Sequence, residues 1–542
     1  MASTSIGSTA SVSLTTAFID LSTFDEIECW LYGGKSVNRF RKVIRKSAWF
    51  TVIAAQLNRC GTTGDFDLEM QSMFSRAGDY IRDVWLRVEL PEVQARPGWQ
   101  ARWTRNIGHN LIQEAYLQFN DLTVNKLTSF HLDFLRAFLI PEGKINGYDN
   151  MIGNIPILTN PYAEYAGLAS DAITAAGGVR LPRQPLNIPL PFYFTRDPHD
   201  AIIQAACPFN DVRVTIKFRA WRDLLIVDRI NTDAEVKNGR SMTEPAAGQS
   251  QMEDLLMSTN LHLTGVQVWA HYAVIPNGDR EKIGEEDNID TVIEQVQTIP
   301  ISQVSPLSQP QKGVDLRFAH SIRALFFAMR NTTIPSEFSN YSTHIPLGFP
   351  NVAGIAFRPI GSTDPVARAI LSYENVDRVN MPADYYTMVS PYYSAVRIPQ
   401  ETGYHLLSYA NRLAGYGTGE ALQPDGSTNF ARLASVNLNV ECSQTCIRQA
   451  TAVAQMPANT PLWDPEFRTA PASFDLIITA SSLSILRFSA GSAGTAASFI
   501  HAWMALLSRS PFCNAVCFFP VSLKRLHVRK RKGILCIYGA TN

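Results

Sequence analysis

The chain has 542 residues and a mass of 60.2 kDa, and its 48 basic and 48 acidic side chains give a formal net charge of zero. With 46% hydrophobic and 18% charged residues, the composition excludes general disorder, which requires low hydrophobicity and high net charge. It also argues against coating nucleic acid over the whole surface, because phosphate binding requires a basic excess. Low surface charge favours self-association.

The charge is unevenly distributed along the chain. Residues 496–542 contain seven Lys or Arg side chains and no Asp or Glu, which leaves 41 basic against 48 acidic groups in residues 1–495. We therefore interpret 496–542 as a separate segment. Its basic run, Lys524–Lys532, could contact nucleic acid or anionic lipid head groups, or could be a solvated end.

The N-terminal arm, residues 1–24, begins with a stretch rich in Ser and Thr. It has neither the basic region nor the apolar core of a signal peptide, so none is predicted. The composition predicts disorder in the free protein and ordering against partners. A short capped helix is expected at Ser22–Leu31, with Ser22 or Thr23 as its N-cap.

Apolar and polar residues alternate with period two in five later stretches, as they do in strands with one buried face. These stretches are Val84–Leu90, Val212–Ala220, Val266–Val274, Leu316–Phe326 and Val436–Val440. Residues 474–489 are interpreted as two strands around a Ser-rich turn. The 32 Gly and 31 Pro residues punctuate these runs, which favours sandwiches or barrels over βαβ proteins. The chain is predicted to be mostly β.

Two further segments are interpreted as insertions in this β framework. Val124–Phe138 is predicted to be a helix or a segment that flanks a strand, and Asp279–Val296 a helix with helically spaced Ile and Val residues. The polar stretch from about Arg229 to Met257 is interpreted as a linker between two β domains. The long loops 153–187 and 335–365 are expected to be functional and to make contacts between subunits.

Motifs that carry catalysis or metal binding are missing from the sequence. Gly33–Ser36 resembles the end of a phosphate-binding loop, but Cys29 stands where that motif needs its first glycine. The ten histidines include no H-x-H pair, and neither HExxH nor GxSxG occurs. His109 could be a base, although a hydrogen-bonded histidine in a packed turn is the preferred interpretation.

Two groups of polar residues have simpler explanations than a site. Asp65, Asp67 and Glu69 would line one face of a strand, for which a solvated strand face is the preferred interpretation and a cation site the alternative. Asn331 and Asn340 fit the glycosylation pattern, yet without a secretory signal we expect both to be unmodified.

The eight cysteines are sparse for this length, which favours a reducing compartment over a disulfide-rich secreted scaffold. The pairs Cys442/Cys446 and Cys513/Cys517 have C-x3-C spacing and could share a zinc ion, although small buried thiols explain them more simply. We therefore predict no catalytic, cofactor-binding or metal-binding residues and no cofactor.

Several longer strings go beyond composition and periodicity. The first half contains FIDLSTFDEIE (18–28), LYGGK (31–35), SRAGDY (75–80), RWTRNIGHNLI (102–112), FNDL (119–122), YDNMIGN (148–154) and PLPFYFTRD (189–197). The second half contains EQVQTIP (294–300), DLRFAHSIRALFFAMRNTT (315–333), SNYST (339–343), SYEN (372–375), TGYHLLSYA (402–410) and GSTNFARL (426–433). In these strings the chain resembles the major capsid protein of iridoviruses and related large icosahedral double-stranded DNA viruses, including ascoviruses and marseilleviruses. The strings follow the family's order across about nine-tenths of the chain.

The resemblance implies an all-β double jelly roll, in which two tandem eight-stranded antiparallel sandwiches carry short helical insertions. On that basis the chain is divided into the N-terminal arm 1–24, a first jelly roll 25–228, a linker 229–257, a second jelly roll 258–495 and an atypical basic and apolar C-terminal extension 496–542. In the family, the chain ends shortly after the strand that corresponds to Phe474–Gly494. The extension is expected to be an inward anchor near an internal membrane, unless it is a reading-frame accident.

The resemblance also implies a structural function without catalytic activity. The protein would self-assemble into pseudo-hexagonal homotrimeric capsomers that tile the icosahedral shell, after assembly in the host cytoplasm. Its partners would be neighbouring capsomers and minor capsid, penton and scaffold proteins, with the two terminal segments near inner-face proteins or an internal membrane and no sequence-specific nucleic-acid binding. The alternatives are a minor capsid or spike protein and a carbohydrate-binding jelly-roll protein.

Overall fold

The computed structural model describes residues 18–19, 21–23, 48–96, 99–159, 161, 180–230, 236–241, 256–258, 260–285, 288–332, 335–343, 364–416, 423–454, 473–489 and 492–495. The chain divides into two compact units, residues 1–49 and 50–542. In the first unit, a helical turn is closed by Ser22 Oγ, which donates to the Ile19 carbonyl at 2.7 Å. Most of the helix expected at Ser22–Leu31 lies outside the described residues, as does the C-terminal extension 496–542.

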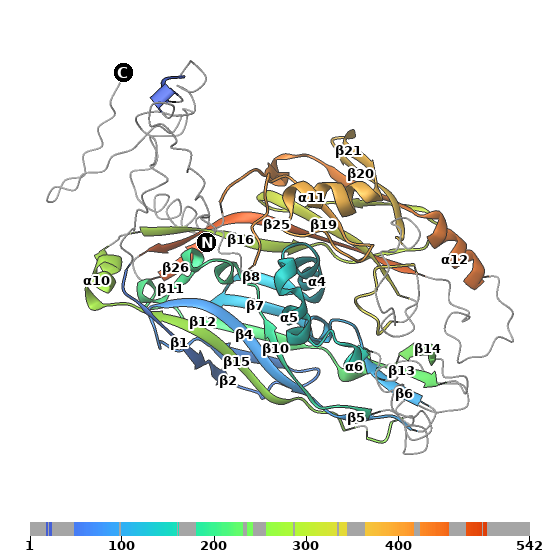
Figure 1. The fold of residues 1–542 in the computed structure, drawn as a ribbon, viewed down its shortest axis with the longest axis horizontal. Coiled ribbons are helices and arrows are strands. Elements are labelled where there is room, and N and C mark those ends of the chain that lie inside the picture. Colours follow the sequence, from blue (N-terminus) through green and yellow to red (C-terminus); the bar gives the residue numbers. More distant parts are fainter. Residues whose placement is uncertain are drawn as a thin grey trace, which may run out of the picture. The chain divides into compact units, whose positions relative to one another are not determined.

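Two antiparallel sheets form the first half of the larger unit (Figure 1). The first sheet has the order β1 (Thr51–Gln56), β15 (Thr264–Val274), β4 (Tyr80–Leu90) and β10 (Gln184–Pro189), with the short β11 (Ile202–Ile203) also on β4. The second has the order β2 (Asn58–Cys60), β3 (Glu69–Met73), β12 (Val212–Phe218), β7 (Ile112–Phe119) and β8 (Leu122–Thr128).

Two further antiparallel sheets form the second half. One has the order β16 (Asn288–Thr298), β25 (Phe474–Ser489), β19 (Ser321–Asn331) and β22 (His405–Ser408), to which the short strands β17 (Ser302–Val304), β23 (Thr428–Asn429) and β26 (Ser492–Thr495) add. The other has the order β18 (Gln311–Asp315), β24 (Val436–Cys442), β20 (Val366–Tyr373) and β21 (Val376–Pro382).

The two halves have the same strand order. If the eight main strands of each half are numbered along the chain, one sheet runs 1-8-3-6 and the other 2-7-4-5 in both halves. This is the order of a jelly roll, which forms when a long antiparallel hairpin folds over into two facing sheets. The chain is therefore a double jelly roll, as the sequence predicts.

The strand pairing moves the boundary between the jelly rolls toward the C-terminus. The expected division places the linker at 229–257 and begins the second jelly roll at 258, but β15 pairs with β1 and β4 and is the eighth strand of the first jelly roll. The expected linker instead contains β14 (Val236–Ser241), which pairs with β13 (Leu225–Ile230), and β13 pairs in turn with β6 (Trp99–Trp103). The chain passes to the second jelly roll after Val274, through α10 (Asn277–Glu285).

The helices are short insertions between strands, as expected. They are α3 (Ile107–Leu111), α4 (Ser129–Phe138), α5 (Glu142–Ile152), α6 (Pro156–Thr159), α9 (Trp221–Leu224), α10, the π-helix η5 (Tyr385–Val389), α11 (Ser390–Ser394) and α12 (Gln444–Ala454). Short 3-10 turns occur at η1 (Tyr193–Thr195), η2 (Pro198–Asp200), η3 (Gln204–Ala206) and η6 (Phe430–Arg432), and β5 (Val93–Gln94) pairs with β9 (Arg180–Leu181). None of the helices that the structure describes is long and apolar enough to cross a membrane.

Four sequence predictions change at the level of single elements. The strand predicted at Leu316–Phe326 begins only at Ser321, the first residue of β19. The segment 124–138 contains both alternatives, since it begins in β8 and continues as α4. The helix predicted at 279–296 ends at Glu285, and its second part is strand β16, which pairs along its whole length with β25. Residues 474–489 form one strand without a turn, because Ser481 and Ser482 hydrogen-bond to Glu294 and Gln295 across the sheet.

Both faces of the sheet that contains β19 and β25 are buried. On β25, Ile478 belongs to the core inside the second jelly roll, whereas its neighbour Ile477 belongs to the larger core that fills the first jelly roll. On β19, Phe326 and Phe327 divide between the two cores in the same way. The two jelly rolls thus share one hydrophobic junction, and this junction positions the polar residues described next.

Candidate functional site

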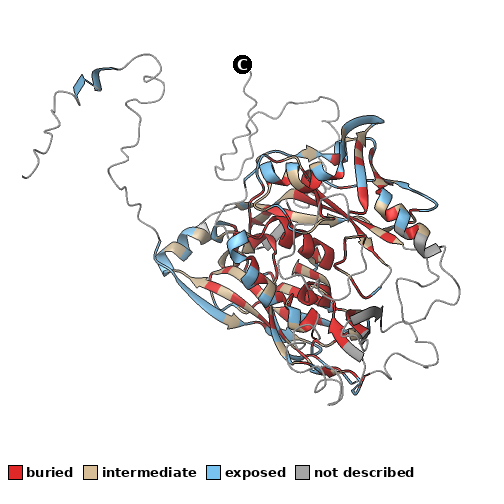
Figure 2. Cartoon of the chain, turned by 45° about the vertical axis from the view of Figure 1, so that its right-hand side comes forward, coloured by how far each residue is buried: buried red, intermediate tan, exposed pale blue. Residues whose placement is uncertain are grey.

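Helix α4 lies at the centre of the junction between the jelly rolls. All ten of its residues are buried, and it lies among the buried helices of Figure 2. The rings of Phe134 and Phe138 lie 5.7 and 5.9 Å from the ring of Phe326 on β19. The helix begins where Thr128 at the end of β8 caps it, accepting a hydrogen bond from the His131 backbone at 3.4 Å.

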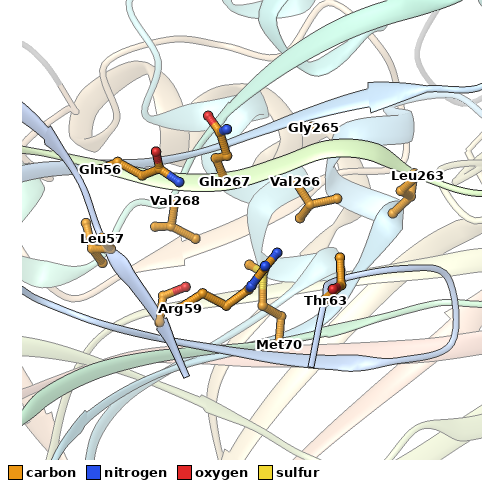
Figure 3. Close-up of a pocket in the computed structure, with 11 residues that line it drawn as sticks. Gln56, Leu57, Arg59, Thr63, Met70, Leu263, Gly265, Val266, Gln267 and Val268 are labelled. Atoms are coloured by element: carbon orange, nitrogen blue, oxygen red, sulfur yellow. The ribbon is translucent and has the colours of Figure 1, made fainter. Parts of the chain in front are cut away.

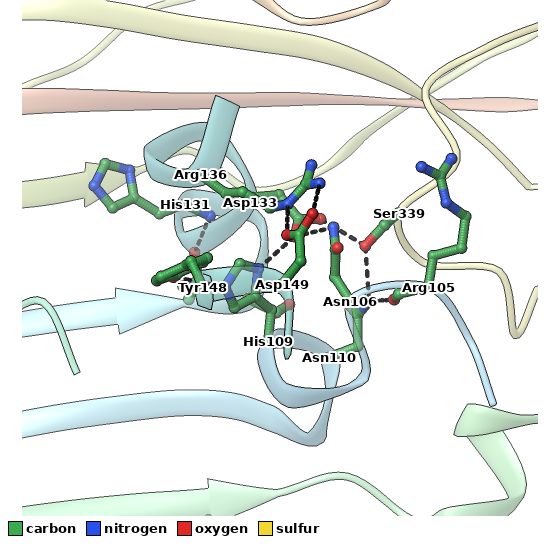
Figure 4. A network of polar contacts seen from close by, with 12 residues as sticks. Arg105, Asn106, His109, Asn110, His131, Asp133, Arg136, Tyr148, Asp149 and Ser339 are labelled. Atoms are coloured by element: carbon green, nitrogen blue, oxygen red, sulfur yellow. Dashed lines mark hydrogen bonds and ion pairs between the residues drawn. The ribbon is translucent and has the colours of Figure 1, made fainter. Parts of the chain in front are cut away.

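Asp133 of α4 organises a buried polar network across the junction (Figure 4). Its carboxylate lies 2.7 Å from His109 Nδ1 and accepts a hydrogen bond from Asn106 Nδ2 at 3.0 Å. From the second jelly roll it accepts hydrogen bonds from Ser339 Oγ at 2.7 Å and Tyr341 OH at 2.9 Å. Burial opposes ionisation, but these hydrogen bonds hold the pKa of Asp133 below its ordinary value. The network therefore ties the two jelly rolls through one charged acceptor.

His109 lies on α3 with both ring nitrogens hydrogen-bonded, as the preferred interpretation of the sequence expects. Its Nε2 lies 2.9 Å from the hydroxyl of Tyr148 and its Nδ1 faces Asp133. A Tyr–His–Asp chain of this kind could in principle activate a hydroxyl. Burial, however, raises the pKa of Tyr148, so the hydroxyl remains protonated. The arrangement suits a structural role better than a catalytic one.

Charged pairs across the junction reinforce this network. Arg102 donates to Glu337 at 2.8 Å, and both side chains are at most 1% exposed. Arg105 pairs with Glu401, and these side chains are 11% and 26% exposed. Such pairs contribute little net stability, because desolvation offsets their attraction, but an unmatched partner is costly and so they fix one relative arrangement.

A second charged cluster lies between β16 and the first jelly roll. Arg196 pairs with Glu294, and the guanidinium of Arg196 lies 4.7 Å from the ring centre of Tyr416, whose hydroxyl accepts from it at 3.2 Å. Although burial opposes ionisation, the nearby arginines keep the pKa of Glu294 below its ordinary value. Ser481 of β25 also donates to Glu294. The pair is buried, so it acts as a fixed connection between the two jelly rolls.

Phe338 provides an aromatic contact at the same junction. The guanidinium of Arg219, at the end of β12, lies 4.1 Å from its ring centre, and that of Arg330 on β19 lies 5.0 Å from it. Arg330 also donates to Asp475 of β25 at 2.9 Å. Each jelly roll thus contributes one cation to the same ring, which is favourable when the partners are desolvated.

The acidic residues singled out in the sequence do not line one strand face. Asp65 precedes β3, accepts a hydrogen bond from the Leu263 backbone at 2.9 Å and lies 2.6 Å from His262 Nδ1. Asp67 occupies a turn with a φ of 61°, and only Glu69 belongs to β3. The predicted common face is therefore wrong, because the turn at Asp67 separates the carboxylates.

The remaining candidates form no site among the described residues. Cys442 and Cys446 are buried free thiols, and no group of three or more metal-ligating side chains occurs in the described part of the chain. Asn331 and Asn340 are 1% and 5% exposed, and the Asn331 backbone donates to the Asn340 carbonyl at 2.9 Å. Gly33–Ser36, Cys513/Cys517 and the basic run Lys524–Lys532 lie outside the described residues.

Several hollows open on the first jelly roll, two of which have contrasting linings. One, of about 310 Å³, lies where the chain crosses from β1 to β2, and Figure 3 shows Arg59, Met70 and Val266 around it. The other, of about 640 Å³, lies over the outer face of β4 and β15, where Trp85 and His271 line it together with α5. Its lining is mainly apolar, whereas that of the first hollow is mixed.

Sequence reasoning missed the junction residues. Arg102, Asp133 and Glu337 are charged, and charged residues are rarely fully buried unless they are paired. Their partners are distant in sequence, so no local spacing reveals the pairs. The available signal was the two nearby cations Arg102 and Arg105 in the string RWTRNIGHNLI. That string contributes several further residues to the junction, including Asn106, His109 and Asn110.

Comparison with known proteins follows the same division into halves. The family model described as "Major capsid protein N-terminus" matches residues 38–274, and that described as "Large eukaryotic DNA virus major capsid protein" matches 280–494. The two matches meet at the same place where the strand order passes from one jelly roll to the other.

Several curated proteins are similar over most of their length. The major capsid protein of Wiseana iridescent virus is 39% identical over 494 residues, which are 89% of this chain and 94% of that protein. The major capsid protein of Invertebrate iridescent virus 6 is 36% identical, with 90% of this chain and 99% of that protein covered. The major capsid protein of Frog virus 3 is 34% identical, with 79% and 88% covered.

Solved structures share the fold at low sequence identity. PBCV-1 VP54, fitted into a reconstruction of the virophage Sputnik, superposes with a TM-score of 0.61 at 18% identity, covering 85% of this chain and 99% of that chain. The Faustovirus major capsid protein superposes with a TM-score of 0.58 at 11% identity, covering 84% and 93%.

Proposed function

The chain belongs to the family of large eukaryotic DNA virus major capsid proteins, and from that membership we propose that it forms homotrimeric capsomers that tile an icosahedral shell. The observation that supports this most strongly is the repetition of one strand order in two jelly rolls of a single chain. Three such chains supply six similar units around a three-fold axis. A ring of six units has a nearly hexagonal outline, which suits a closely packed flat facet.

The junction supports this proposal because a lattice unit must keep one geometry. The shared core and the buried pairs Arg102–Glu337 and Arg196–Glu294 hold the two jelly rolls as one body. Contacts between subunits that form a closed ring are heterologous, so they require a fixed rotation from one copy to the next. With a flexible connection between the jelly rolls, the rotation from one copy to the next would vary.

We propose further that the protein has no catalytic role. The acid and base groups that the fold brings together, such as Asp133 and His109, are buried and hydrogen-bonded to one another. In this proposal the protein lies in the outer shell of the virion after assembly in the host cytoplasm. There it contacts neighbouring capsomers and minor capsid, penton and scaffold proteins, with both terminal segments toward inner-face proteins or an internal membrane.

The test is the mass of the purified protein in solution by light scattering, with negative-stain images of the same peak. We expect the mass of three 60.2-kDa chains, roughly 180 kDa, and particles with a hexagonal outline. A monomer at every concentration, without such particles, would contradict the proposal of a self-assembling trimer.

A further inference from the structure

The two jelly rolls repeat one another in detail around their fourth and fifth strands. In the first, an eight-residue strand (β7), a two-residue turn and a seven-residue strand (β8) lead directly into α4. In the second, β20 has eight residues, the turn has two, β21 has seven, and the helical segment of η5 and α11 follows. Tyr392 therefore stands ten residues after the end of β21, just as Phe138 stands ten residues after the end of β8.

The third strands of the two jelly rolls also correspond. β4 and β19 both have 11 residues, and their sixth residues are Trp85 and Phe326. Each sixth residue is paired with the eighth strand of its own jelly roll, Trp85 with Trp269 and Phe326 with Thr479. Trp85 is thus the counterpart of Phe326.

Within the chain, the helical segment of the first jelly roll covers the third strand of the second. The ring of Phe138 lies 5.9 Å from that of Phe326, and Phe326 is only 1% exposed. The edges of the jelly rolls meet at the same place. Gln295 Nε2 of β16 donates to the Val124 carbonyl of β8 at 2.8 Å, and Asn125 Nδ2 of β8 donates to the Glu294 carbonyl at 3.3 Å.

No other described residue covers the corresponding surfaces at the other two sides of the chain. On η5 and α11, Val389, Tyr392 and Tyr393 are 44%, 67% and 77% exposed, which is unusual for large apolar side chains so close together. On the first jelly roll, Trp85 lines the apolar hollow of about 640 Å³. The hollow is a concave surface, whereas the two tyrosines are mostly exposed to solvent.

We propose that the η5–α11 segment of one copy docks into the Trp85 hollow of the next copy, repeating between copies the packing of α4 on Phe326 within the chain. The occupant is therefore a second copy of this chain, and the inference rests on the proposed trimer. Tyrosine suits this role because its ring fills apolar space while its hydroxyl remains near polar groups. His271 and Asp83, which lie 3.0 Å apart at the hollow, supply such groups.

The correspondence between the packing within the chain and the proposed packing between copies also brings two exposed sheet edges together. β8 and β16 adjoin within the chain, whereas their counterparts β21 and β1 lie on opposite sides in Figure 1 and pair only with β20 and β15 among the described strands. Val376 and Met381 on β21 are 70% and 42% exposed, and Val52 and Ile53 on β1 are 38% and 39% exposed. Docking of α11 at Trp85 places β21 beside β1 of the next copy, so both apolar edges become covered.

The experiment compares three forms of the full-length protein by light scattering over a range of concentrations. The test variant is the double substitution Tyr392→Glu/Tyr393→Glu, and the matched control is Phe209→Glu, since Phe209 is an equally exposed aromatic residue (75%) on neither surface. We expect the control to form trimers like the wild type. The test variant should need at least about tenfold higher concentration for half-assembly, because it places charges in an apolar contact.

A second measurement guards against misfolding of the test variant. In the double variant Tyr393→Cys/Met151→Cys, the proposed docking brings the thiol on α11 of one copy to the thiol on α5 of the next copy. Met151 lines the hollow and is 38% exposed. Mild oxidation by a disulfide reagent should link three copies covalently, with each new bond formed from two thiols as the reagent is reduced. Each single variant should give no covalent trimer.

The outcomes separate this inference from the proposed function. A wild type that forms trimers, together with a test variant that assembles equally well and a double-cysteine variant that does not link, would overturn the docking and leave the trimer intact. A wild type that is monomeric at every concentration would overturn both.

Discussion

Asp133 accepts an unusually large number of the hydrogen bonds at the junction for a single residue. It accepts hydrogen bonds from the first jelly roll through Asn106 and His109, and from the second through Ser339 and Tyr341. A buried carboxylate is tolerated only when its acceptor sites are filled, and here the donors come from segments more than 200 residues apart. All hydrogen bonds to the Asp133 carboxylate therefore form only when both jelly rolls are packed together, so this residue favours the correct arrangement of the two.

Replacement of this acceptor should be costly. In Asp133→Asn, one oxygen becomes a donor that faces other donors, and we expect the free energy of unfolding to fall by about 2–4 kcal/mol. The matched control is Asp315→Asn, whose 48%-exposed carboxylate pairs with the exposed Arg317. That change should cost less than about 0.5 kcal/mol. Denaturant titration measures both, and equal losses would show that the network contributes nothing beyond a surface pair.

At the scale of elements, β25 is the strand on which both cores depend. Its 16 residues pair with β16 on one side and β19 on the other, and alternate side chains enter different cores. Toward its C-terminal end the outer face becomes accessible, since Ile485 is 44% exposed. One strand thus provides two isoleucines in opposite environments.

Truncation of these two side chains should separate the effect of burial on stability from the effect of strand propensity, because both changes are Ile→Ala on the same strand. Ile477→Ala removes a fully buried side chain from the junction core and should lower the free energy of unfolding by about 2–5 kcal/mol. Ile485→Ala, on the same strand, should cost less than about 1 kcal/mol, because its side chain already contacts solvent. Thermal or denaturant unfolding gives both values. Similar losses at the two positions would mean that the outer face of β25 is not packed as described.

How much of these elements the sequence could predict depends on how they are buried. Period-two alternation identified β4, β12, β15 and β24, because each has one apolar and one more polar face. The alternating run Leu316–Phe326 overlaps only the first part of β19, and the rest of that strand is buried on both faces. β25 is also buried on both faces, and its serines suggested a turn. The domain boundary was displaced for another reason, since the eighth strand of a jelly roll returns from a long excursion and only pairing reveals where it belongs.

At the scale of the whole molecule, the junction makes stability depend on pH. His131 lies with its ring 5.7 Å from that of Phe326, and its Nδ1 is 3.4 Å from Thr479 Oγ1. Burial, with a contribution from Arg196 and against the attraction of Glu294, lowers its pKa from 6.5 to about 4. The folded protein therefore keeps this imidazole neutral in a range where the unfolded chain protonates it.

The sign follows from proton binding. Between pH 6.5 and 4 the unfolded chain binds one more proton at this site than the folded protein, so stability decreases as the pH falls through that window, by about 3 kcal/mol in total. His131→Gln should remove this slope. Denaturant unfolding at several pH values measures the slopes. An unchanged slope in His131→Gln would show that His131 is protonated equally in both states.

The position of β15 has a consequence for biosynthesis. This strand ends at Val274, yet it lies between β1 and β4, strands that leave the ribosome about 200 residues earlier. The first sheet therefore cannot close during translation until just over half the chain has been made, and until then β1 and β4 expose unpaired edges. Long-range pairing of this kind is slow and prone to aggregation. The nascent chain thus passes through a prolonged stage in which the unpaired strands of its first jelly roll are exposed to aggregation.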